Sequence, residues 1–201
     1  MFSWNTWKSL ILCGCLALCG LVSGCDHVVL TGLNQLQLTE FSVKGSRLFM
    51  SGTITRKTLD HFDETFARHP GIETLVPLEV RGSIDDETML ALAYRVRELG
   101  LDTHLTAQSE IYSGGVDLFL AGVKRSMETG AVIGVHSWRD MNKDAADYPR
   151  DAPEHEPNRK YIEDMLGHDG FYWFTIYAAP AEDIHIMTPE EIARYGLINA
   201  G

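Results

Sequence analysis

A serine at a glycine-rich turn is the residue in this chain best suited to nucleophilic chemistry. Within YSGGVDLFLAG (112–122), Ser113 precedes Gly114 and Gly115, and apolar residues then recur at helical spacing. Glycines allow backbone amides to approach a bound group closely. Unpaired amides and the positive end of the helix dipole converge at a helix start. That environment stabilises a developing oxyanion, so we interpret Ser113 as a candidate nucleophile.

His136 and Asp183 supply the other two side chains of a possible catalytic triad. We expect His136 at the end of a strand and Asp183 in a turn before another strand. A serine hydroxyl is a poor nucleophile until an imidazole takes its proton, and a carboxylate then fixes the tautomer of that imidazole. Sequence spacing does not show that the three side chains meet. From the residues alone, an ordinary exposed serine therefore remains an alternative.

The elements that must position these residues alternate between strands and helices. We expect a hairpin over 36–50, followed by helices at 57–69, 85–99 and 113–127 and strands at 72–80, 104–107 and 131–135. This alternation predicts an α/β fold with a largely parallel sheet. The stretch 137–158 is charged and poor in apolar residues, so we expect an exposed insertion there. Further on, the pattern predicts a helix at 159–166, a helix or a buried segment at 171–179, a strand at 183–187 and a capped helix after Thr188.

Residues 1–24 are typical of a targeting segment, with Lys8 ahead of an apolar core at 10–21. Small residues directly before Cys25 resemble the lipobox of bacterial lipoproteins. That resemblance implies lipid attachment at Cys25, a tether over 25–35, a domain over 36–201, and a location in the bacterial cell envelope facing the periplasm. Asp26 resembles an inner-membrane retention signal. An ordinary secretory signal and an uncleaved anchor remain alternatives.

Composition excludes several kinds of chemistry. The formal net charge is −11, with no basic cluster to neutralise phosphates, which argues against a nucleic-acid surface. All cysteines lie at or before position 25, so the domain after the tether has no cysteine nucleophile, disulfide or cysteine-ligated zinc. We expect no cofactor and no metal. Several residues after position 153 have side chains that can bind a metal, but they lack a recognised ligand spacing, and we prefer to interpret the histidines among them as surface residues. The residues are Glu154, His155, Glu156, His168, Asp169 and His185.

Three other features have simpler interpretations. We expect His104 to be a structural residue of its strand. Asp117 follows Ser113 by about one helical turn, and we interpret it as a packing or first-turn charge. The aromatic run 171–177 is interpreted as core, with a peptide- or lipid-binding wall as the alternative.

Four segments resemble the Clp protease–crotonase superfamily, and within it the proteolytic subunit of Clp protease. They are RLFMSGTI (47–54), LEVRGSI (78–84), the serine stretch with AVIGVHS (131–137), and DIHIMTPEEIARYGLI (183–198). The resemblance implies a spiral of β-β-α units. It also implies a nucleophile at Ser113, a general base at His136 and an orienting acid at Asp183.

An oxyanion hole is implied as well, from the amide of Gly114 with that of Gly82 or Ser83. The expected function is a membrane-tethered serine hydrolase, and specifically a peptidase acting on peptide or protein substrates through an acyl-enzyme intermediate. An esterase or thioesterase using the same triad, and a non-catalytic binding or assembly module, remain alternatives.

The chain also departs from the Clp pattern. Arg81-Gly82-Ser83 stands where Clp peptidases have proline and two glycines, and Gly114 stands where they usually have methionine. The insertion 137–158 replaces a region that Clp peptidases use to assemble stacked rings. These departures argue against ring assembly and leave a smaller homo-oligomer open.

Overall fold

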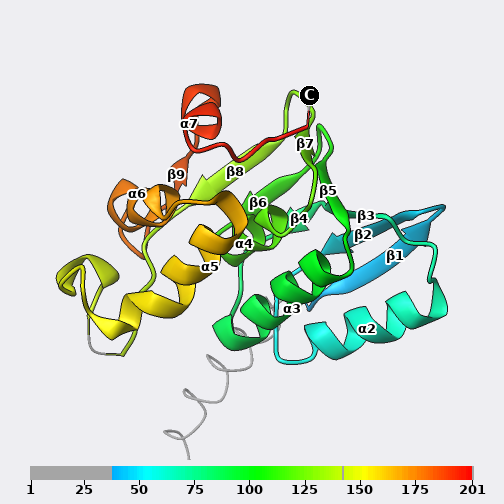
Figure 1. Ribbon diagram of the computed structural model, residues 1–201, viewed down its shortest axis with the longest axis horizontal. Coiled ribbons are helices and arrows are strands. Elements are labelled where there is room, and N and C mark those ends of the chain that lie inside the picture. The colour runs from blue at the N-terminus through cyan, green and yellow to red at the C-terminus, as the bar shows by residue number, and fades with distance from the viewer. Residues whose placement is uncertain (1–37, 142, 201) are drawn as a thin grey trace, which may run out of the picture. The chain divides into compact units, whose positions relative to one another are not determined.

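The computed structural model describes residues 38–141 and 143–200 (Figure 1). The expected signal segment, the lipidation site Cys25 and the tether lie outside the described residues. Within the described part, no helix is long and apolar enough to cross a membrane.

A five-stranded sheet begins with the expected hairpin, and its order is β1-β2-β3-β5-β7. β1 and β2 pair antiparallel, and every other pair of neighbours is parallel. Its strands are β1 (Glu40–Lys44), β2 (Arg47–Ser51), β3 (Thr74–Pro77), β5 (Asp102–Leu105) and β7 (Arg125–Met127). The hairpin and the parallel character of the sheet were both predicted.

A second sheet of four strands has the order β4-β6-β8-β9. Its strands are β4 (Glu79–Val80), β6 (Glu110–Tyr112), β8 (Val132–Val135) and β9 (His185–Ile186). The chain therefore passes from the first sheet to the second three times, from β3 to β4, from β5 to β6 and from β7 to β8. Each passage is one turn of a β-β-α spiral, which agrees with the predicted fold class.

Pro77 accounts for one difference from the predicted strands. A single strand was expected over 72–80, but β3 ends at Pro77 and β4 begins at Glu79. Proline has no amide hydrogen to continue a ladder. The amide of Leu78 still donates to the carbonyl of Met50 at 2.8 Å. The break sends the chain from the first sheet to the second.

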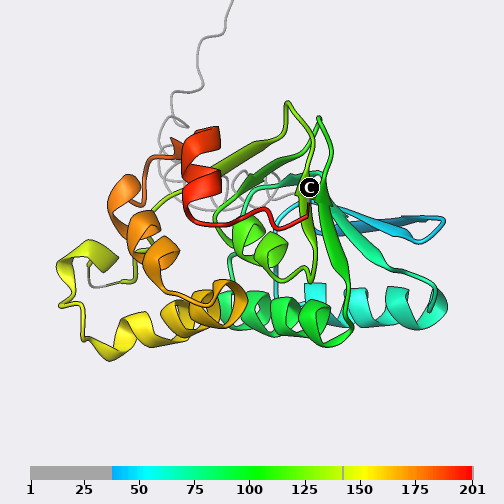
Figure 2. The same ribbon diagram turned by 45° about the horizontal axis from the view of Figure 1, so that its top comes forward.

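Helices α2 (Thr58–Arg68), α3 (Asp86–Glu98) and α5 (Glu156–Leu166) lie in a row along one side of the sheets (Figure 2). The N-terminus of α3 is capped as expected, because the Asp85 carboxylate accepts the amide of Thr88 at 2.9 Å. Met89, Leu92 and Val96 bury one face of α3 in the core.

Helix α4 (Gly114–Leu120) is shorter than predicted, because a helix to position 127 was expected. A Cβ added to Gly122 would lie 2.1 Å from Thr103 Oγ1, so the chain passes directly against β5 at that point. Residues 125–127 then form β7. Strand β6 was also missed, since only one strand was expected between α3 and Ser113.

The segment 137–158 is partly built into the core, which corrects the expectation of an exposed insertion. It contains the 3-10 turns η1 (Ala145–Asp147) and η2 (Pro153–His155), and Ala145 and His155 are both buried. Helix α5 starts at Glu156, inside the stretch that was interpreted as loop. The remaining helices are α6 (Gly170–Ala178) and α7 (Pro189–Arg194), and α7 has a complete capping box between Thr188 and Glu191.

Hydrogen bonds of a buried arginine connect residues 196–200 to β7. Arg125 is 4% exposed, and its guanidinium donates to the carbonyls of Leu197 at 2.8 Å and of Gly122 and Gly196 at 3.2 Å. The side-chain oxygen of Asn199 accepts the Arg125 amide at 2.7 Å. These bonds satisfy a buried cation without a carboxylate.

Candidate active site

Ser113 occupies the turn between strand β6 and helix α4. Its backbone has φ 50° and ψ −124°, and it is the one non-glycine residue with positive φ in the described part of the chain. Such a conformation costs about 1–3 kcal/mol and persists only where neighbours impose it. Here the Ser113 amide donates to the carbonyl of Gly134 at 3.1 Å, and the Ser113 carbonyl accepts the amide of Val116 at 2.7 Å. Backbone strain is therefore placed at the predicted nucleophile.

The two glycines after Ser113 are required by close packing of the helix start. A Cβ on Gly115 would lie 2.8 Å from Val80 Cγ1 and 2.9 Å from the Val80 carbonyl oxygen. A Cβ on Gly114 would lie 3.0 Å from Ser83 Cβ. The first turn of α4 thus packs closely against β4 and the turn that follows it, with no room for a side chain at Gly115 and little at Gly114.

The turn Gly82-Ser83 lies beside Ser113. Gly82 has φ 118°, and a Cβ there would lie 3.2 Å from Ser113 Cβ and 3.6 Å from Ser113 Oγ. The amides of Gly82, Ser83 and Gly114 donate no hydrogen bond to any described residue. They are thus free to bind an oxyanion beside Ser113, and their assignment as the oxyanion hole remains a prediction.

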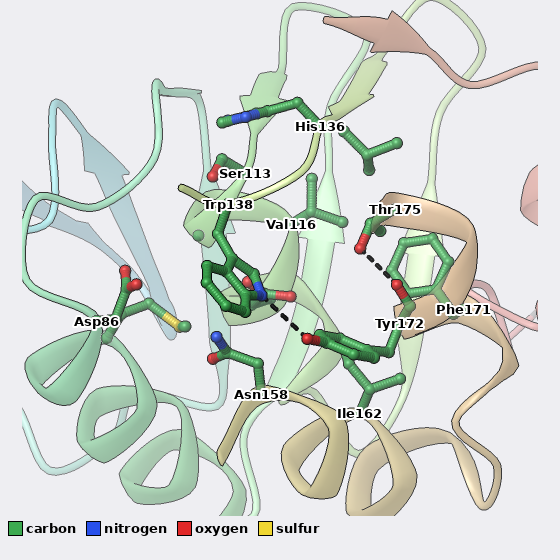
Figure 3. Close-up of a pocket in the computed structure, with 14 residues that line it drawn as sticks. Asp86, Ser113, Val116, His136, Trp138, Asn158, Ile162, Phe171, Tyr172 and Thr175 are labelled. Carbon is green, nitrogen blue, oxygen red and sulfur yellow. Dashed lines mark hydrogen bonds between the residues drawn. The ribbon is translucent and has the colours of Figure 1, made fainter. Parts of the chain in front are cut away.

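His136 follows β8 and lines the same pocket as Ser113 (Figure 3). Its Nδ1 lies 2.8 Å from the carbonyl oxygen of Ser137. A carbonyl can only accept, so Nδ1 donates to it, and in the neutral imidazole the lone pair is then on Nε2. This is the tautomer that a general base requires. Over the described residues, no hydrogen bond joins Ser113 Oγ to His136.

Asp183 does not line this pocket. Its side chain is exposed, and Oδ1 accepts the amide of Ile184 at 2.8 Å. The pairing of β8 with β9 ends at Val135 and His185, and the Ser137 amide donates to the carbonyl of Ala179 at 2.9 Å, so the ladder does not continue to Asp183. No hydrogen bond between Asp183 and His136 occurs in the described part. The Ser137 carbonyl orients the imidazole instead, and an orienting role for Asp183 remains a prediction.

The pocket extends from Ser113 between helices α3, α4, α5 and α6, and Figure 3 shows Ser113 and His136 at one end with Asn158 and Ile162 at the other. Trp138 stands across it, and its Nε1 donates to the hydroxyl of Tyr172 at 3.0 Å. The wall is part apolar and part polar. Its further lining residues are Asp86, Met89, Gly114, Val116, Asp117, Val135, Phe171 and Thr175.

Asp117 is the functional candidate that the sequence interpretation missed. It lies four residues after Ser113 on α4 and faces the pocket rather than serving only as a packing charge. Burial, with a smaller effect from Asp86, raises the pKa of Asp117 to about 7. The spacing from Ser113 was visible in the sequence, but the walls from α5 and α6 that desolvate the carboxyl were not.

The histidines of the competing metal site are dispersed. His155 is 1% exposed rather than on the surface, and its Nδ1 lies 2.7 Å from the Tyr172 hydroxyl within an aromatic cluster. His185 Nε2 lies 2.9 Å from Glu191 Oε2. His104 Nδ1 lies 2.8 Å from Ser126 Oγ on the neighbouring strand, which fits a structural role. Across residues 38–141 and 143–200, no three His, Cys, Asp or Glu side chains are grouped so as to hold a metal ion.

The aromatic run is largely core, although it also contributes to the pocket. Phe171 and Tyr172 are buried, and Phe174 packs against Tyr195 with ring centroids 4.8 Å apart. Tyr177 is 58% exposed. The preferred interpretation thus holds for the buried half of the run.

Solved structures share this arrangement of strands and helices. An enoyl-CoA hydratase from Thermoplasma volcanium is 14% identical, over 83% of this chain and 72% of that chain, with a TM-score of 0.51. The chain has the Clp protease–crotonase fold. A methylmalonyl-CoA decarboxylase is 8% identical over 82% of this chain and 67% of its own, also with a TM-score of 0.51. A membrane-bound stomatin-specific protease is 16% identical over 79% and 80% of the two chains, with a TM-score of 0.49.

Identities this low show the fold alone, because one fold hosts many reactions. No family model matches the chain, and no curated protein matches it. Function must therefore be argued from the pocket.

Proposed function

We propose that this chain is a serine hydrolase, and specifically a peptidase, that forms an acyl-enzyme intermediate on Ser113. The observation that carries the proposal is the strained backbone of Ser113, at φ 50° between a strand and a helix. Strain of this kind gathers at functional sites, and the same strand–turn–helix context presents the nucleophile of other serine hydrolases. His136 lines the same pocket, and its Nδ1 is held by the Ser137 carbonyl, which leaves Nε2 for the serine.

The reaction follows from these groups. His136 Nε2 takes the proton of Ser113 Oγ as Oγ bonds to the substrate carbonyl carbon. The free amides at Gly114 and at Gly82 or Ser83 bind the resulting oxyanion. Collapse breaks the carbon–nitrogen bond, and the leaving amine takes the proton from Nε2. Water then hydrolyses the ester by the same route, which regenerates Ser113. Hydrogen bonds of unliganded sites are often long and tighten when substrate binds.

The proposal places the enzyme at a membrane of the bacterial cell envelope, through lipid on Cys25. Its support is the run of small residues before Cys25 and the apolar core at 10–21. Asp26 favours the inner membrane, and a peptide or protein in the periplasm would be the substrate. Metabolic labelling with an alkyne fatty acid should mark the chain and fail to mark Cys25→Ala. Equal labelling of both would refute the anchor without touching the catalytic proposal.

A fluorophosphonate probe on the full-length chain tests the catalytic proposal. We expect covalent labelling of the native chain and no labelling of Ser113→Ala or His136→Ala. Ser42→Ala is the matched control, because Ser42 is exposed on β1, and it should label normally. Absence of labelling in a chain with a cooperative unfolding transition would refute the hydrolase.

A second candidate, a non-catalytic binding module, is favoured by one observation. No hydrogen bond joins Ser113 to His136 or His136 to Asp183 in the described part. An unlabelled but folded protein would point to this alternative. If labelling occurs, a panel of peptide, ester and thioester substrates separates peptidase from esterase or thioesterase activity.

A further inference from the structure

The pocket beside Ser113 contains two carboxylates and neither lysine nor arginine to pair with them. Asp86, Asp117 and Asn158 contribute side-chain oxygens, and neither lysine nor arginine occurs among the lining residues. Its volume is about 60 Å³. At about 15 Å³ for each water molecule, the pocket has space for roughly four water-sized atoms. A straight side chain with about four atoms beyond Cβ matches it.

The Asp117 carboxyl lacks a hydrogen-bond partner among the described residues. Its own carbonyl accepts the hydroxyl of Tyr161 at 2.6 Å, but no donor from residues 38–141 or 143–200 bonds to the carboxylate. The Asp117 side chain is half-buried, which makes its ionised form less favourable when it has no partner, and Asp86 adds a second negative charge nearby. An anionic ligand would add to this repulsion, whereas a cationic group would be attracted by both carboxylates and would pair with Asp117.

The two carboxylates lie at different depths, with Asp86 at the mouth of the pocket and Asp117 closer to its interior. Asp86 is exposed at the start of α3, and its Oδ1 accepts the hydroxyl of Ser83 at 2.5 Å. That bond joins Asp86 to the turn beside Ser113. Asp117 lies further in, together with apolar side chains of Met89, Val116 and Ile162. The methylene groups of a bound side chain would pack against these apolar residues, and a terminal charge would lie beside Asp117.

We propose that this pocket selects substrates by a cationic, lysine-like side chain adjoining the bond to be cut. The inference rests on the proposed hydrolase, because it places that side chain beside the Ser113 acyl group. The Asp117 carboxylate pairs with the ammonium, the Asn158 amide oxygen accepts a further hydrogen bond, and Asp86 attracts the charge at the mouth. Asp117 is then a specificity residue and takes no part in bond breaking.

Paired peptides with lysine or norleucine before the scissile bond test the selection, since norleucine has nearly the same length without the charge. We expect kcat/KM for lysine to exceed that for norleucine by about tenfold or more at pH 8. The ratio should decrease on lowering the pH from 8 to 6, because Asp117, whose pKa is about 7, becomes protonated. A preference for norleucine would overturn the proposal.

Asp117→Asn should bring the ratio close to one and remove its dependence on pH. Glu87→Gln is the matched control, since it removes the same charge from an exposed position on α3 that does not line the pocket, and it should keep the lysine preference. Thermal unfolding establishes that both variants fold. A folded Asp117→Asn variant with the full lysine preference would overturn the proposal.

Binding to Ser113→Ala separates this inference from the proposed hydrolase. Calorimetry with Nα-acetyl-lysine N-methylamide, whose side-chain ammonium is free, and with its norleucine analogue measures binding without turnover. Tighter binding of the lysine compound would support the cationic pocket even if the fluorophosphonate failed to label the native chain. Labelling without lysine preference would overturn this inference and leave the hydrolase standing.

Discussion

Ser113→Gly should make the fold more stable while abolishing labelling by a fluorophosphonate. Ser113 holds φ 50°, a region that glycine enters without steric cost. Ser113→Ala removes the same hydroxyl but keeps Cβ and therefore the strain. The two variants should thus be equally inactive and differ in their free energies of unfolding.

The size of the difference follows from two opposing terms. Relief of the strained backbone is worth about 1–3 kcal/mol. The greater freedom of glycine in the unfolded chain opposes this by about 0.4–1 kcal/mol. Loss of the hydroxyl affects both variants alike, since Ser113 Oγ has no hydrogen-bond partner within the described residues. Ser113→Gly should therefore exceed Ser113→Ala in stability by about 1 kcal/mol.

Urea unfolding followed by tryptophan fluorescence measures this difference. With a slope of about 2 kcal/mol per molar, the midpoint of Ser113→Gly should lie about 0.5 M above that of Ser113→Ala. Ser42 on β1 supplies the control pair, because a glycine in an ordinary strand weakens it. Ser42→Gly should be less stable than Ser42→Ala. A Ser113→Gly midpoint at or below that of Ser113→Ala would refute the claim that strain is stored at the serine.

Three further results are expected. Gly115→Ala should lower stability by about 1–3 kcal/mol and weaken labelling, because its Cβ would lie 2.9 Å from the backbone oxygen of Val80, which has little freedom to move. Asp117→Asn should gain stability relative to the native chain as the pH rises from about 4 to about 7. Over that range the native carboxyl, with its raised pKa, stays protonated when folded and ionises when unfolded, and the effect is at most about 4 kcal/mol. Tyr172→Phe should cost about 1–3 kcal/mol, because it leaves the buried His155 Nδ1 unpaired.

Each of these has its own check. Gly71→Ala should be nearly neutral, since a Cβ there meets nothing within 4 Å. Chemical denaturation at pH 5 and pH 8 measures the Asp117 effect, and equal differences at both values would contradict it. Thermal unfolding measures the Tyr172 effect, and an unchanged midpoint would show that the bond to His155 adds nothing.

The sequence predicted the parts of this fold that depend on local pattern. The hairpin, the caps of α3 and α7, and the strand that delivers His136 have periodicity or capping residues that can be read directly. Helix α4 was overextended because apolar spacing continues past Leu120, whereas its end is set by contact of Gly122 with Thr103 on another strand. Strand β7 was missed because it begins with the buried cation Arg125, which has the appearance of a surface residue.

The candidate site shows the same division. Ser113 and His136 could be proposed because each ends an element that the sequence predicts. The role of Asp117 could not, since its pKa depends on walls contributed by α5 and α6, more than thirty residues further along the chain. Within the segment 137–158, Ala145 and His155 reach the core by tertiary packing that composition alone does not reveal.

The bonds of Arg125 have a consequence for biosynthesis. Its guanidinium remains without two of its acceptors until residues 196 and 197 have been added, more than seventy positions later. A nascent chain on the ribosome would therefore carry a buried cation with incomplete partners, which opposes early closure of the domain. The fold can be completed only after release of these residues from the exit tunnel.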